Sequence, residues 1–382
     1  MKKKFLIITT IPMSFIFFKG QIQVLKQEFD IELVSSPGKE FDVTCKTEKV
    51  LGHRIKMKRE ISLFNDFVSL LKLTRLFFNL KPEIIHGSTP KAGLLSMIAA
   101  WINKVPTRIY YIHGLRYQGN TGLKKSLLVT MERLSCFFST DIFAVSNGVK
   151  NNLILDKITK KEINIINNGS VNGIDAAYFS PTNTEIKDLK HNYNINSNDF
   201  IYGFVGRLVK DKGINELIEA FIKINAKNKN TKLILVGGFE DQLDPLNSTI
   251  KNEILNNSNI INTGFQTDIR PFLKMMDVFV FPSYREGFGV SLMEASAMET
   301  PVISSNIIGC NEIIKHNYNG LLVTSKSVFE LKKAMLQLLH SKEKLRTMSS
   351  VTRAFIIDKY EQKKLWNSTL KAYLKIHNKT IV

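Results

Sequence analysis

Cysteine is scarce in this 382-residue chain, which contains only Cys45, Cys136 and Cys310, far apart from one another. There is no Cys-x-x-Cys pair, and no Cys/His cluster has the spacing of metal ligands. Because the count is odd and sparse, it favours a protein of the reducing cytoplasm and argues against structural zinc.

Long apolar runs are absent as well. The N-terminus comes nearest, since Lys2, Lys3 and Lys4 precede an apolar run over 5–18 that imitates a secretory signal. Pro12 interrupts this run, and no small-residue cleavage site follows it. Elsewhere no run approaches the roughly 18 apolar residues that a membrane span needs. We therefore expect a soluble or peripheral protein.

Acidic residues are also in short supply. The chain has 34 Asp and Glu against 53 Lys and Arg, a formal net charge of +19. This excess calls for an anionic partner, and charge alone does not choose among nucleic acid, an acidic membrane surface and a phosphorylated small molecule. Because 44% of the residues are apolar, the chain can bury two or three domain cores, which excludes a disordered or collagen-like protein.

Strand-like and helix-like segments alternate along the chain, which predicts parallel sheets covered by helices. In the first half we expect strands at 3–9, 31–35, 83–87, 107–114, 141–146 and 163–169, and helices at 21–29, 62–80, 91–102 and 123–138. In the second half we expect strands at 200–206, 231–238, 259–264, 278–283 and 301–305, and helices at 214–227, 246–256, 268–276 and 290–298.

The two halves are joined by a turn-rich passage that contains Gly173 and Pro181. We predict an α/β protein of two doubly wound, Rossmann-like domains, over 1–170 and 171–358, which face each other across a cleft. An amphipathic helix at about 359–382 needs a surface to cover. Since parallel sheets bind ligands at the carboxyl ends of their strands, chemistry is expected at the strand-to-loop junctions.

The most informative junction lies within 281–297, where a strand leads through a glycine-bracketed turn into a helix. Three residues form this turn: Gly287, Phe288 and Gly289. Such a turn offers backbone N–H groups and the positive end of a helix dipole to a phosphate or a sugar. Glu286 and Glu294 flank it, and a carboxylate can accept two hydrogen bonds from a vicinal diol. Taken singly, each glutamate could be an ordinary surface acid, but the pair indicates a ligand site.

The first strand of the second half ends at Gly206, and Arg207 and Lys212 follow on a short loop. The glycine spacing fits neither a dinucleotide-binding fingerprint nor a Walker A loop. Arg207 can bind a diphosphate in bidentate fashion, and Lys212 adds a charge where a leaving group becomes negative. Ordinary surface bases are the alternative. No Asp-x-Asp pair occurs in the chain to hold Mg²⁺, so we expect chemistry without a metal.

In the first half, a strand delivers His113 to the same kind of junction. A histidine there can orient a hydroxyl or share a proton near neutral pH. A structural role is the alternative, and His86, at the end of the preceding strand, is a competing candidate. We favour His113 because Gly114 follows it and lets a ligand approach the backbone.

Several segments together resemble the retaining GT-B glycosyltransferases of family 4, which use nucleotide-diphosphate sugars. They are the Glu286-to-Glu294 element, GRLVKDKG at 206–213, HGLR at 113–116 and NGSVNGID at 168–175. The similarity runs from the first strand to about residue 320. More narrowly, TTIPMSF at 9–15, VSSPGKE at 34–40, STPKAGLL at 88–95 and HGLRYQG at 113–119 resemble the subgroup that builds capsular, O-antigen and related bacterial surface glycans.

The resemblance implies a role for each site residue. Glu294 would bind the ribose diol, and Glu286 the hydroxyls of the donor sugar. Arg207 and Lys212 would bind the diphosphate, while His113 would contact the donor sugar near the reacting carbon. Phe288 and Gly289 would lend backbone N–H groups to the donor, and Gly206 and Gly287 complete the donor-binding residues. The final helix would cross back to cover the N-terminal domain.

The implied reaction transfers a sugar from a nucleotide-diphosphate donor to a polyprenyl-diphosphate-linked sugar at the cytoplasmic face of the plasma membrane. We expect a UDP-linked N-acetylated hexose or deoxyhexose and no cofactor. Acceptor-side candidates are Pro12, Met13, Ser14, Lys91 and Arg116. Many relatives carry a glycine pair where this chain has Thr10 to Ser14, so the part played by this loop is open. The motifs place no carboxylate as a nucleophile, which favours same-face attack over a covalent intermediate.

Positive charge is concentrated in residues 1–180, with 26 Lys and Arg against 14 Asp and Glu. The bases include Lys2 to Lys4, Arg54 to Arg59, Lys72, Arg75, Lys124 and Lys125. Phenylalanine-rich stretches at 15–18 and 76–78 lie close to them in the sequence, which suits an anionic membrane surface. Ordinary core phenylalanines and solvated bases are the alternative.

Other functions remain open at this point. Nucleic-acid binding would need stacking platforms or a recognition helix, and neither is found. A nucleotide-sugar epimerase and a non-catalytic sugar-nucleotide-binding protein share the expected fold. The intact set of Glu286, Glu294, Arg207 and Lys212 favours transfer over both.

Overall fold

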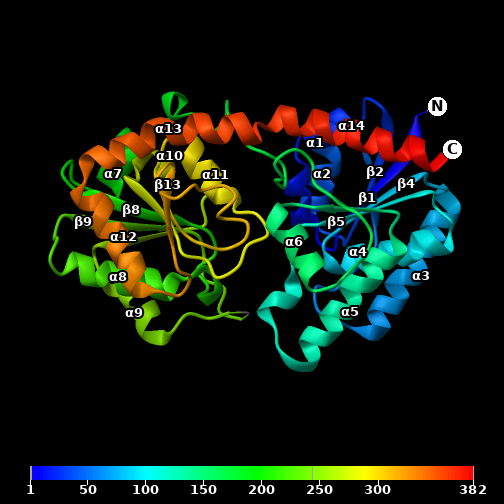
Figure 1. Cartoon of the computed structure of the whole chain (residues 1–382), viewed down its shortest axis with the longest axis horizontal. Coiled ribbons are helices and arrows are strands. Elements are labelled where there is room, and N and C mark those ends of the chain that lie inside the picture. The colour runs from blue at the N-terminus through cyan, green and yellow to red at the C-terminus, as the bar shows by residue number, and fades with distance from the viewer. Residues whose placement is uncertain (1, 243, 382) are drawn as a thin grey trace. The chain divides into compact units, whose positions relative to one another are not determined.

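The computed structural model describes residues 2–242 and 244–381, and the chain divides into two compact units. Unit 1 comprises Met1–Gly173 with Gln362–Val382, and unit 2 comprises Ile174–Glu361. The predicted boundaries lie three residues earlier at both junctions. Each unit is a parallel sheet with helices on both faces (Figure 1), so the predicted doubly wound α/β class is confirmed.

The sheet of unit 1 has the order β3-β2-β1-β4-β5-β6-β7, and the paired strands run parallel. Its strands are β1 (Lys3–Ile8), β2 (Phe29–Ser35), β3 (Leu51–Arg54), β4 (Ile84–Ser88), β5 (Thr107–Ile112), β6 (Asp141–Ala144) and β7 (Ile163–Asn164). The residues from Phe5 to Ile8 are fully buried, as expected for a central strand that is covered on both faces.

The helices of unit 1 connect these strands. They are η1 (Pro12–Phe18), α1 (Gln21–Leu25), α2 (Lys39–Glu48), α3 (Leu63–Leu80), α4 (Pro90–Ile102), η2 (Arg116–Gly119), α5 (Gly122–Phe138), α6 (Asn147–Leu155) and α14 (Gln362–Ile381). The N-terminus of α4 is capped from the loop that follows β1, because the Ala92 N–H donates to Oγ1 of Thr10 at 3.1 Å. Proline at the first position of α4 suits this start, since its missing N–H would lack a helical partner.

The C-terminal helix α14 belongs to unit 1, as predicted. It packs against α1 and β5 (Figure 1), and its Trp366 ring touches Gly20, where an added Cβ would lie 2.4 Å from the ring. Trp366 donates from Nε1 to Asn172 Oδ1 at 2.7 Å, and the Tyr373 side chain is buried among the rings of Phe5 and Phe143. The apolar face of α14 that the sequence predicts is therefore the face that covers the sheet of unit 1.

Unit 2 repeats the plan with the strand order β10-β9-β8-β11-β12-β13. Its strands are β8 (Phe200–Val205), β9 (Thr231–Val236), β10 (Ile260–Gly264), β11 (Val278–Phe281), β12 (Val302–Ser305) and β13 (Gly320–Val323). Its helices are η3 (Pro181–Asn183), α7 (Lys187–Asn192), η4 (Lys210–Lys212), α8 (Ile214–Asn225), α9 (Ser248–Asn256), α10 (Arg270–Met275), α11 (Val290–Ala297), α12 (Val328–His340) and α13 (Lys342–Tyr360). Chain order reverses between β1 and β4 and between β8 and β11, the switch points where such sheets bind ligands.

Some elements differ from the sequence prediction. The helix expected at 21–29 ends at Leu25, and Phe29 already belongs to β2. The strand expected at 163–169 has only two residues, because Asn167 and Gly169 adopt positive φ angles that end it. Seven α-helices and strands were not predicted, namely α2, β3, α6, α7, β13, α12 and α13, and neither were the four short 3₁₀ helices η1 to η4. The final helix begins at Gln362 because Glu361 leaves the helical region of backbone conformation.

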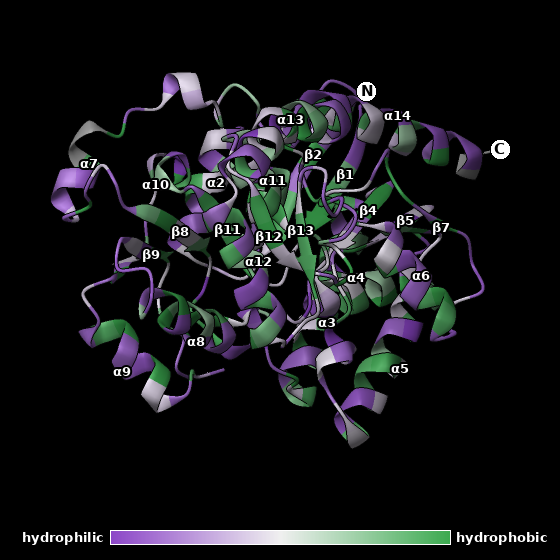
Figure 2. Cartoon of the chain, turned by 60° about the vertical axis from the view of Figure 1, so that its left-hand side comes forward, coloured by the Kyte–Doolittle hydropathy of each residue, from purple (hydrophilic) through white to green (hydrophobic). Residues whose placement is uncertain are grey.

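Apolar residues are concentrated in the strands of both units, while most helices alternate between polar and apolar faces (Figure 2). Among the residues that the structure describes, no helix combines the length and apolar character required to cross a membrane.

Candidate active site

Lys212 and Glu286 form an ion pair in unit 2, on the loops that follow β8 and β11. The side chains are 19% and 13% exposed. The two loops touch at Gly213, where an added Cβ would lie 2.1 Å from the Pro282 carbonyl oxygen and where φ is +71°. Glycine therefore allows the close approach that brings the predicted diphosphate base and the predicted sugar-binding acid together.

Glu286 has a second partner that fixes its orientation. The Ser283 hydroxyl donates to Glu286 Oε1 at 2.8 Å, the same oxygen that faces Lys212. No described residue donates a hydrogen bond to Oε2, which leaves this oxygen for a ligand. The Lys212 ammonium also lies 5.1 Å from the centre of the Phe281 ring. The end of β11 and the loop that follows it thus preorganise the pair.

Glu294 lies in the second turn of α11 and differs from Glu286 in its surroundings. Burial raises the pKa of its carboxyl group to about 7. Among the described residues, none forms a hydrogen bond or an ion pair with this carboxyl group. An acid without a partner in such a place costs folding free energy, and a diol that donates two hydrogen bonds would stabilise its ionised form.

Arg207 is paired with Glu240, which follows β9, and the Arg207 side chain is 54% exposed. The two bases predicted to bind a diphosphate are therefore held by different carboxylates, Arg207 by Glu240 and Lys212 by Glu286. Gly206 precedes this loop, and its carbonyl oxygen would lie 1.9 Å from a Cβ added at Gly237. An incoming diphosphate has to share these bases with the carboxylates or displace them.

The glycine-bracketed turn was predicted to offer two backbone N–H groups to a ligand, those of Phe288 and Gly289, and only the first is unpaired among the described residues. The Gly289 N–H donates to the Gly309 carbonyl at 2.8 Å, so a ligand would have to displace this hydrogen bond. The N–H of Phe288 has no partner among the described residues. Its ring is 5% exposed and packs edge-on against Tyr360 with centroids 5.5 Å apart. Gly287 contacts Gly309, where an added Cβ would lie 2.7 Å from the Gly287 carbonyl oxygen.

His113 follows β5 in unit 1 and lies between the rings of Phe17 and Tyr111, with centroids at 5.1 and 4.8 Å. Its Nε2 is 3.2 Å from the Ser88 hydroxyl, and its Nδ1 has no partner among the described residues. Burial lowers the pKa of His113 to about 4, so the ring is neutral at neutral pH. Phe17 comes from η1, which places the atypical first loop against the predicted sugar-contacting histidine.

His86, the competing candidate, is enclosed by aromatic rings. It is 1% exposed and contacts the rings of Phe18, Tyr111 and Tyr373 at centroid distances of 5.3, 5.6 and 5.7 Å. Burial and the nearby His113 lower the pKa of His86 to about 3. A ring enclosed in this way does not contact a ligand directly, and it can act on one only through the residues that surround it.

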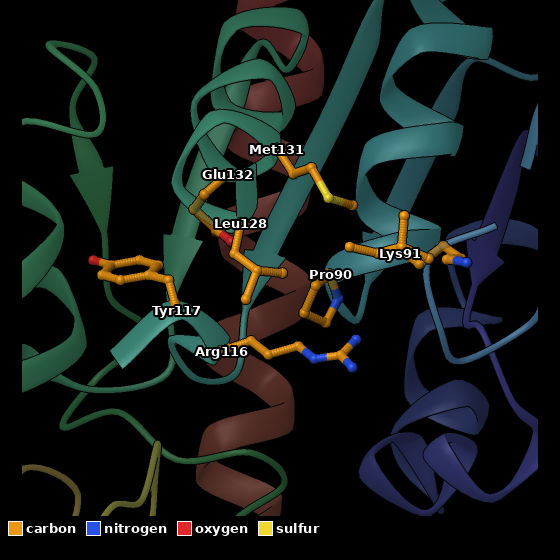
Figure 3. A pocket seen from close by; sticks show the side chains of 8 residues that line it. Pro90, Lys91, Arg116, Tyr117, Leu128, Met131 and Glu132 are labelled. Carbon is orange, nitrogen blue, oxygen red and sulfur yellow. The ribbon is translucent and has the colours of Figure 1, made fainter. Parts of the chain in front are cut away.

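The acceptor-side candidates occupy two places in unit 1. Pro12, Met13 and Ser14 open η1, where Met13 is 69% exposed and the Ser14 N–H donates to Ile11. Lys91 and Arg116 line one small hollow together with apolar side chains (Figure 3). The apolar lining residues are Ile61, Pro90, Leu128 and Met131.

Of the two bases in this hollow, only Arg116 has no acidic partner among the described residues. The acid Glu132 also lines the hollow, where it accepts a hydrogen bond from the Tyr110 hydroxyl at 2.8 Å and burial raises its pKa to about 7. Lys91 is 4% exposed, and its ammonium group donates to Asp66 at 2.7 Å and to the Glu60 carbonyl. Arg116 is exposed and donates to the backbone carbonyl of Arg59 at 3.2 Å. The structure therefore favours Arg116 over Lys91 as a partner for an anionic acceptor.

Sequence inspection missed the residues that support the predicted ones. Ser283 orients Glu286, Glu240 pairs with Arg207, and Ser88 contacts His113. Each follows or ends a strand, and Ser283 stands three residues before Glu286, so the strand-end rule could have found them. Phe17 carried no such signal, because the turn of η1 that directs it toward His113 could not be predicted.

The solved structures that resemble this one are glycosyltransferases with two Rossmann-like domains. Anabaena HepE in complex with UDP superposes with a TM-score of 0.81 at 19% identity, covering 98% of this chain and 100% of HepE. WaaG, a glycosyltransferase of lipopolysaccharide biosynthesis, gives a TM-score of 0.72 at 14% identity, covering 97% and 98% of the two chains. The fold is therefore that of the GT-B glycosyltransferases.

Sequence comparison gives the family. The family described as "Glycosyltransferase Family 4" matches residues 25–170, and "Glycosyl transferases group 1" matches residues 185–355. The capsular polysaccharide biosynthesis glycosyltransferase CapM of Staphylococcus aureus is 35% identical over 371 residues, 96% of this chain and 95% of CapM. The chain belongs to glycosyltransferase family 4 and is a glycosyltransferase, which confirms the resemblance carried by its motifs.

Two further relatives are named for acceptors carried on undecaprenyl diphosphate. The Escherichia coli UDP-Gal:alpha-D-GlcNAc-diphosphoundecaprenol alpha-1,3-galactosyltransferase is 27% identical over 358 residues, 89% of each chain. An N-acetylgalactosaminyltransferase of Campylobacter jejuni that acts on N,N'-diacetylbacillosaminyl-diphospho-undecaprenol is 29% identical over 328 residues, 83% of each chain.

Proposed function

We propose that this protein transfers a sugar from a UDP-sugar to a sugar carried on polyprenyl diphosphate, with retention of configuration, in the synthesis of a bacterial surface polysaccharide. The observation that carries the proposal is the preorganised Lys212–Glu286 pair with the unpartnered Glu294, all in unit 2. Relatives named for capsule synthesis and for undecaprenyl-diphosphate acceptors support the pathway and the acceptor class.

In this proposal the donor is bound through its nucleotide by unit 2. The ionised Glu294 accepts two hydrogen bonds from the ribose diol. Lys212 and Arg207 bind the diphosphate, which exchanges with or adds to their present carboxylate partners. The free Oε2 of Glu286 accepts a hydrogen bond from a hydroxyl of the donor sugar. An N-acetylated hexose or deoxyhexose is the sugar we propose.

The chemical step follows from the charges at this site. As the bond between the anomeric carbon and the phosphate oxygen breaks, Lys212 and Arg207 stabilise the negative charge that collects on the UDP. The acceptor hydroxyl attacks the anomeric carbon from the same face, and its proton passes to the departing phosphate oxygen. Glu286 is held by Lys212 and Ser283, so we assign it to binding and not to nucleophilic attack. Isolation of a glycosyl adduct on Glu286 would contradict this step.

We propose that the step needs no cofactor or metal, because Lys212 and Arg207 supply the positive charge. Among residues 2–242 and 244–381, no group of three or more His, Cys, Asp or Glu side chains is placed to hold a metal ion. Turnover that survives extensive treatment with a chelator is the expected result. Loss of turnover that Mg²⁺ or Mn²⁺ restores would overturn this part of the proposal.

A membrane-facing surface on unit 1 suits a lipid-linked acceptor. The N-terminal turns of α3 and α5 expose Leu63, Phe64, Phe67 and Leu123 at 83, 77, 59 and 91%. α4 packs against both helices, and bases on the same unit, among them Lys124, accompany this face. Exposed apolar side chains beside bases bind anionic bilayers. We propose a peripheral location on the cytoplasmic face of the plasma membrane.

This surface differs from the one suggested by the sequence. Phe15, Phe18 and Phe77 are core residues, exposed by 2, 3 and 1%, whereas Ile16 and Phe78 are exposed by 64 and 69%, so the stretches 15–18 and 76–78 face solvent only in part. Further exposed apolar residues lie about one helical turn apart at the start of α3. Helix periodicity shows that one side of α3 is apolar, and only the packing against α4 shows which side is covered.

The test is a screen of UDP-sugars with the purified protein and a polyprenyl-diphosphate sugar, measured by release of UDP and by mass of the product lipid. One donor should give acceptor-dependent UDP release and a lipid heavier by one sugar, with the anomeric configuration retained. Donor conversion without any acceptor would indicate an epimerase, and binding without turnover by any donor would indicate a non-catalytic protein. The variant Arg207→Ala, which should abolish turnover, serves as the inactive control, and Glu294→Ala should mainly weaken donor binding.

A further inference from the structure

The small hollow of unit 1 contains polar groups that are not all engaged. It lies between the start of α4, the turn η2 and α5 (Figure 3). The Lys91 ammonium and the Tyr117 hydroxyl are each paired with an aspartate at 2.7 Å. Glu132 and Arg116 are the two polar side chains of the lining that keep hydrogen-bonding capacity for a ligand.

Glu132 enters the hollow from α5 and is held at one of its two oxygens. The Tyr110 hydroxyl donates to Oε1 at 2.8 Å. Tyr110 can pass close against α4 because position 93 is glycine, where an added Cβ would lie 2.2 Å from the Tyr110 ring. No described residue donates to Oε2, and this oxygen is not sealed off, since Glu132 lines the hollow. Burial raises the pKa of Glu132 to about 7, so a donor at Oε2 would stabilise its ionised form.

The rest of the lining is apolar. It consists of Ile61, Pro90, Leu128 and Met131, and the free space has room for about one group of the size of a water or a methyl. A water in this space would lack the two to four polar partners that buried waters have. A methyl group would instead gain contacts with the apolar side chains. The hollow therefore fits a ligand group that joins a methyl to a hydrogen-bond donor.

An acetamido group has this combination. In a trans secondary amide the N–H points away from the C=O, so the N–H and the acyl methyl lie on the same side of the amide bond. The methyl can enter the apolar space while the N–H donates to Glu132 Oε2. A hydroxyl in the same place would leave the apolar lining unused, and the methyl of a deoxy sugar would leave Oε2 without a donor.

Arg116 adds a second anchor to the same hollow. Its side chain is exposed, and its one hydrogen bond among the described residues goes to the Arg59 carbonyl. A guanidinium binds a phosphate in bidentate fashion. In a 2-acetamido sugar 1-diphosphate, the acetamido nitrogen and the first phosphate are attached to adjacent carbons. One such ligand can therefore meet both Glu132 and Arg116.

We propose that this hollow binds the acetamido group of the acceptor sugar, with Glu132 accepting its N–H, and that Arg116 binds the adjacent diphosphate. The inference rests on the proposed function, whose acceptor is a sugar diphosphate, and it makes Glu132 a specificity-determining residue. All residues of this subsite belong to unit 1, so the choice of acceptor does not depend on a side chain of unit 2.

The first test compares ligands on the full-length wild-type protein without any donor. Octyl diphosphates that carry N-acetylglucosamine or glucose differ only at the acetamido position. We expect the N-acetylated ligand to bind about 10-fold more tightly, because it adds a methyl contact and a hydrogen bond to a carboxylate. The N-propionyl analogue should bind more weakly than the N-acetyl ligand, since the hollow has no room for a second carbon.

Calorimetry measures these three affinities. Equal affinity for the N-acetylglucosamine and glucose ligands would overturn the inference. Undiminished affinity for the N-propionyl analogue would overturn it as well, because the acyl group would then lie outside the hollow.

The second test uses variants. Glu132→Gln keeps the size of the side chain but leaves one acceptor oxygen for two donors, the Tyr110 hydroxyl and the ligand N–H. The preference for the N-acetylated ligand should fall below about 3-fold, whereas Arg116→Ala should weaken both sugar ligands alike. Glu48→Gln is the matched control and should keep the preference, because Glu48 is a buried acid of α2 that does not line the hollow. A folded Glu132→Gln protein with the full preference would contradict the role of Glu132.

The outcomes separate this inference from the proposed function. Because the ligand comparison uses the wild-type protein, it decides the question even if Glu132→Gln fails to fold. Equal binding of the two sugars would overturn the acetamido subsite and leave the UDP-release test of the proposed function standing. Failure of all these diphosphates to bind would contradict the acceptor class of the proposed function, and the subsite with it.

Discussion

The positive side chains of the donor site are already paired before a ligand arrives, and one acid is not. Lys212 faces Glu286 and Arg207 faces Glu240, so the charge of each base is compensated in the free protein. Glu294 has no such compensation, and burial raises its pKa to about 7. Burial of this acid without a partner lowers the free energy of unfolding, and in return the acid is already in place to bind a diol.

Replacing Glu294 with glutamine should separate stability from binding. The folded pKa of about 7 lies above the ordinary value of 4.5, so the folded state is penalised as pH rises through this window. At pH 8 the penalty is about 3 kcal/mol, and Glu294→Gln removes it. We expect the variant to unfold at a higher temperature than the wild type at pH 8, with a difference that shrinks as the pH falls and vanishes below about pH 4.

The same variant should lose nucleotide affinity. Glutamine cannot accept two hydrogen bonds as a carboxylate does, so UDP should bind roughly 10- to 100-fold more weakly at pH 8. In the wild type, UDP affinity should fall as pH drops below 7, because Glu294 must lose its proton to bind the diol, whereas the variant should lack this dependence. Calorimetry between pH 5.5 and 8.5 measures both. Unchanged UDP affinity would remove Glu294 from the donor site.

Lys212 should matter for the chemical step more than for folding. Lys212→Ala removes the charge that stabilises the departing UDP and leaves Glu286 without its partner, so kcat should fall roughly 100- to 1000-fold. Lys210→Ala is the matched control, since Lys210 lies in the same turn η4 and is exposed. Assays of UDP release at saturating donor measure the effect. Similar rates for the two variants would show that Lys212 has no special role.

At the scale of the elements, the alternation of apolar runs and amphipathic segments predicted the central strands and placed the functional residues at their ends. Lys212, Glu286 and His113 all follow central strands of their sheets. The missed elements lie mostly at the sheet edges and in the C-terminal part, such as β3, with its partly exposed Gly52 and His53, and α13. The sequences of β3, α7 and α13 are rich in polar residues, so tertiary packing and not periodicity determines these elements. β13 has only four residues, which is too short for a pattern to show. Likewise, the face of α3 that stays exposed could not be predicted from its sequence, because it depends on the packing of α3 against α4.

The exposed face at the start of α3 and α5 should control membrane binding. Replacing Phe64 and Leu123 together with glutamine removes apolar area that would enter the bilayer, and partitioning into anionic vesicles should fall at least 10-fold. Phe329→Gln in α12 of unit 2 is the control, because Phe329 is 71% exposed but lies outside this face. Vesicle flotation with and without acidic lipid measures the effect. Equal binding to neutral and anionic vesicles, or none to either, would contradict the membrane proposal.

At the scale of the whole molecule, the chain separates its two chemical tasks between the units. The donor-site residues Arg207, Lys212, Glu286 and Glu294 all lie within Ile174–Glu361, while the excess positive charge and the exposed apolar helix starts belong to unit 1. We therefore assign the bases behind the net charge of +19 to two partners. A few of them bind a nucleotide diphosphate, and the larger share binds an acidic surface.

Because unit 2 is a continuous segment inserted between two parts of unit 1, it should fold and bind nucleotide by itself. Residues 174–361 expressed alone should bind UDP within about 10-fold of the full chain, since every side chain assigned to the nucleotide lies in this segment. The isolated segment should show no transfer, because His113 and the acceptor candidates lie in unit 1. Calorimetry with UDP, with Glu294→Gln in the same segment as the control, measures the first expectation. A folded segment without UDP affinity would show that unit 1 contributes to nucleotide binding, and the donor site would then have to be extended to its residues.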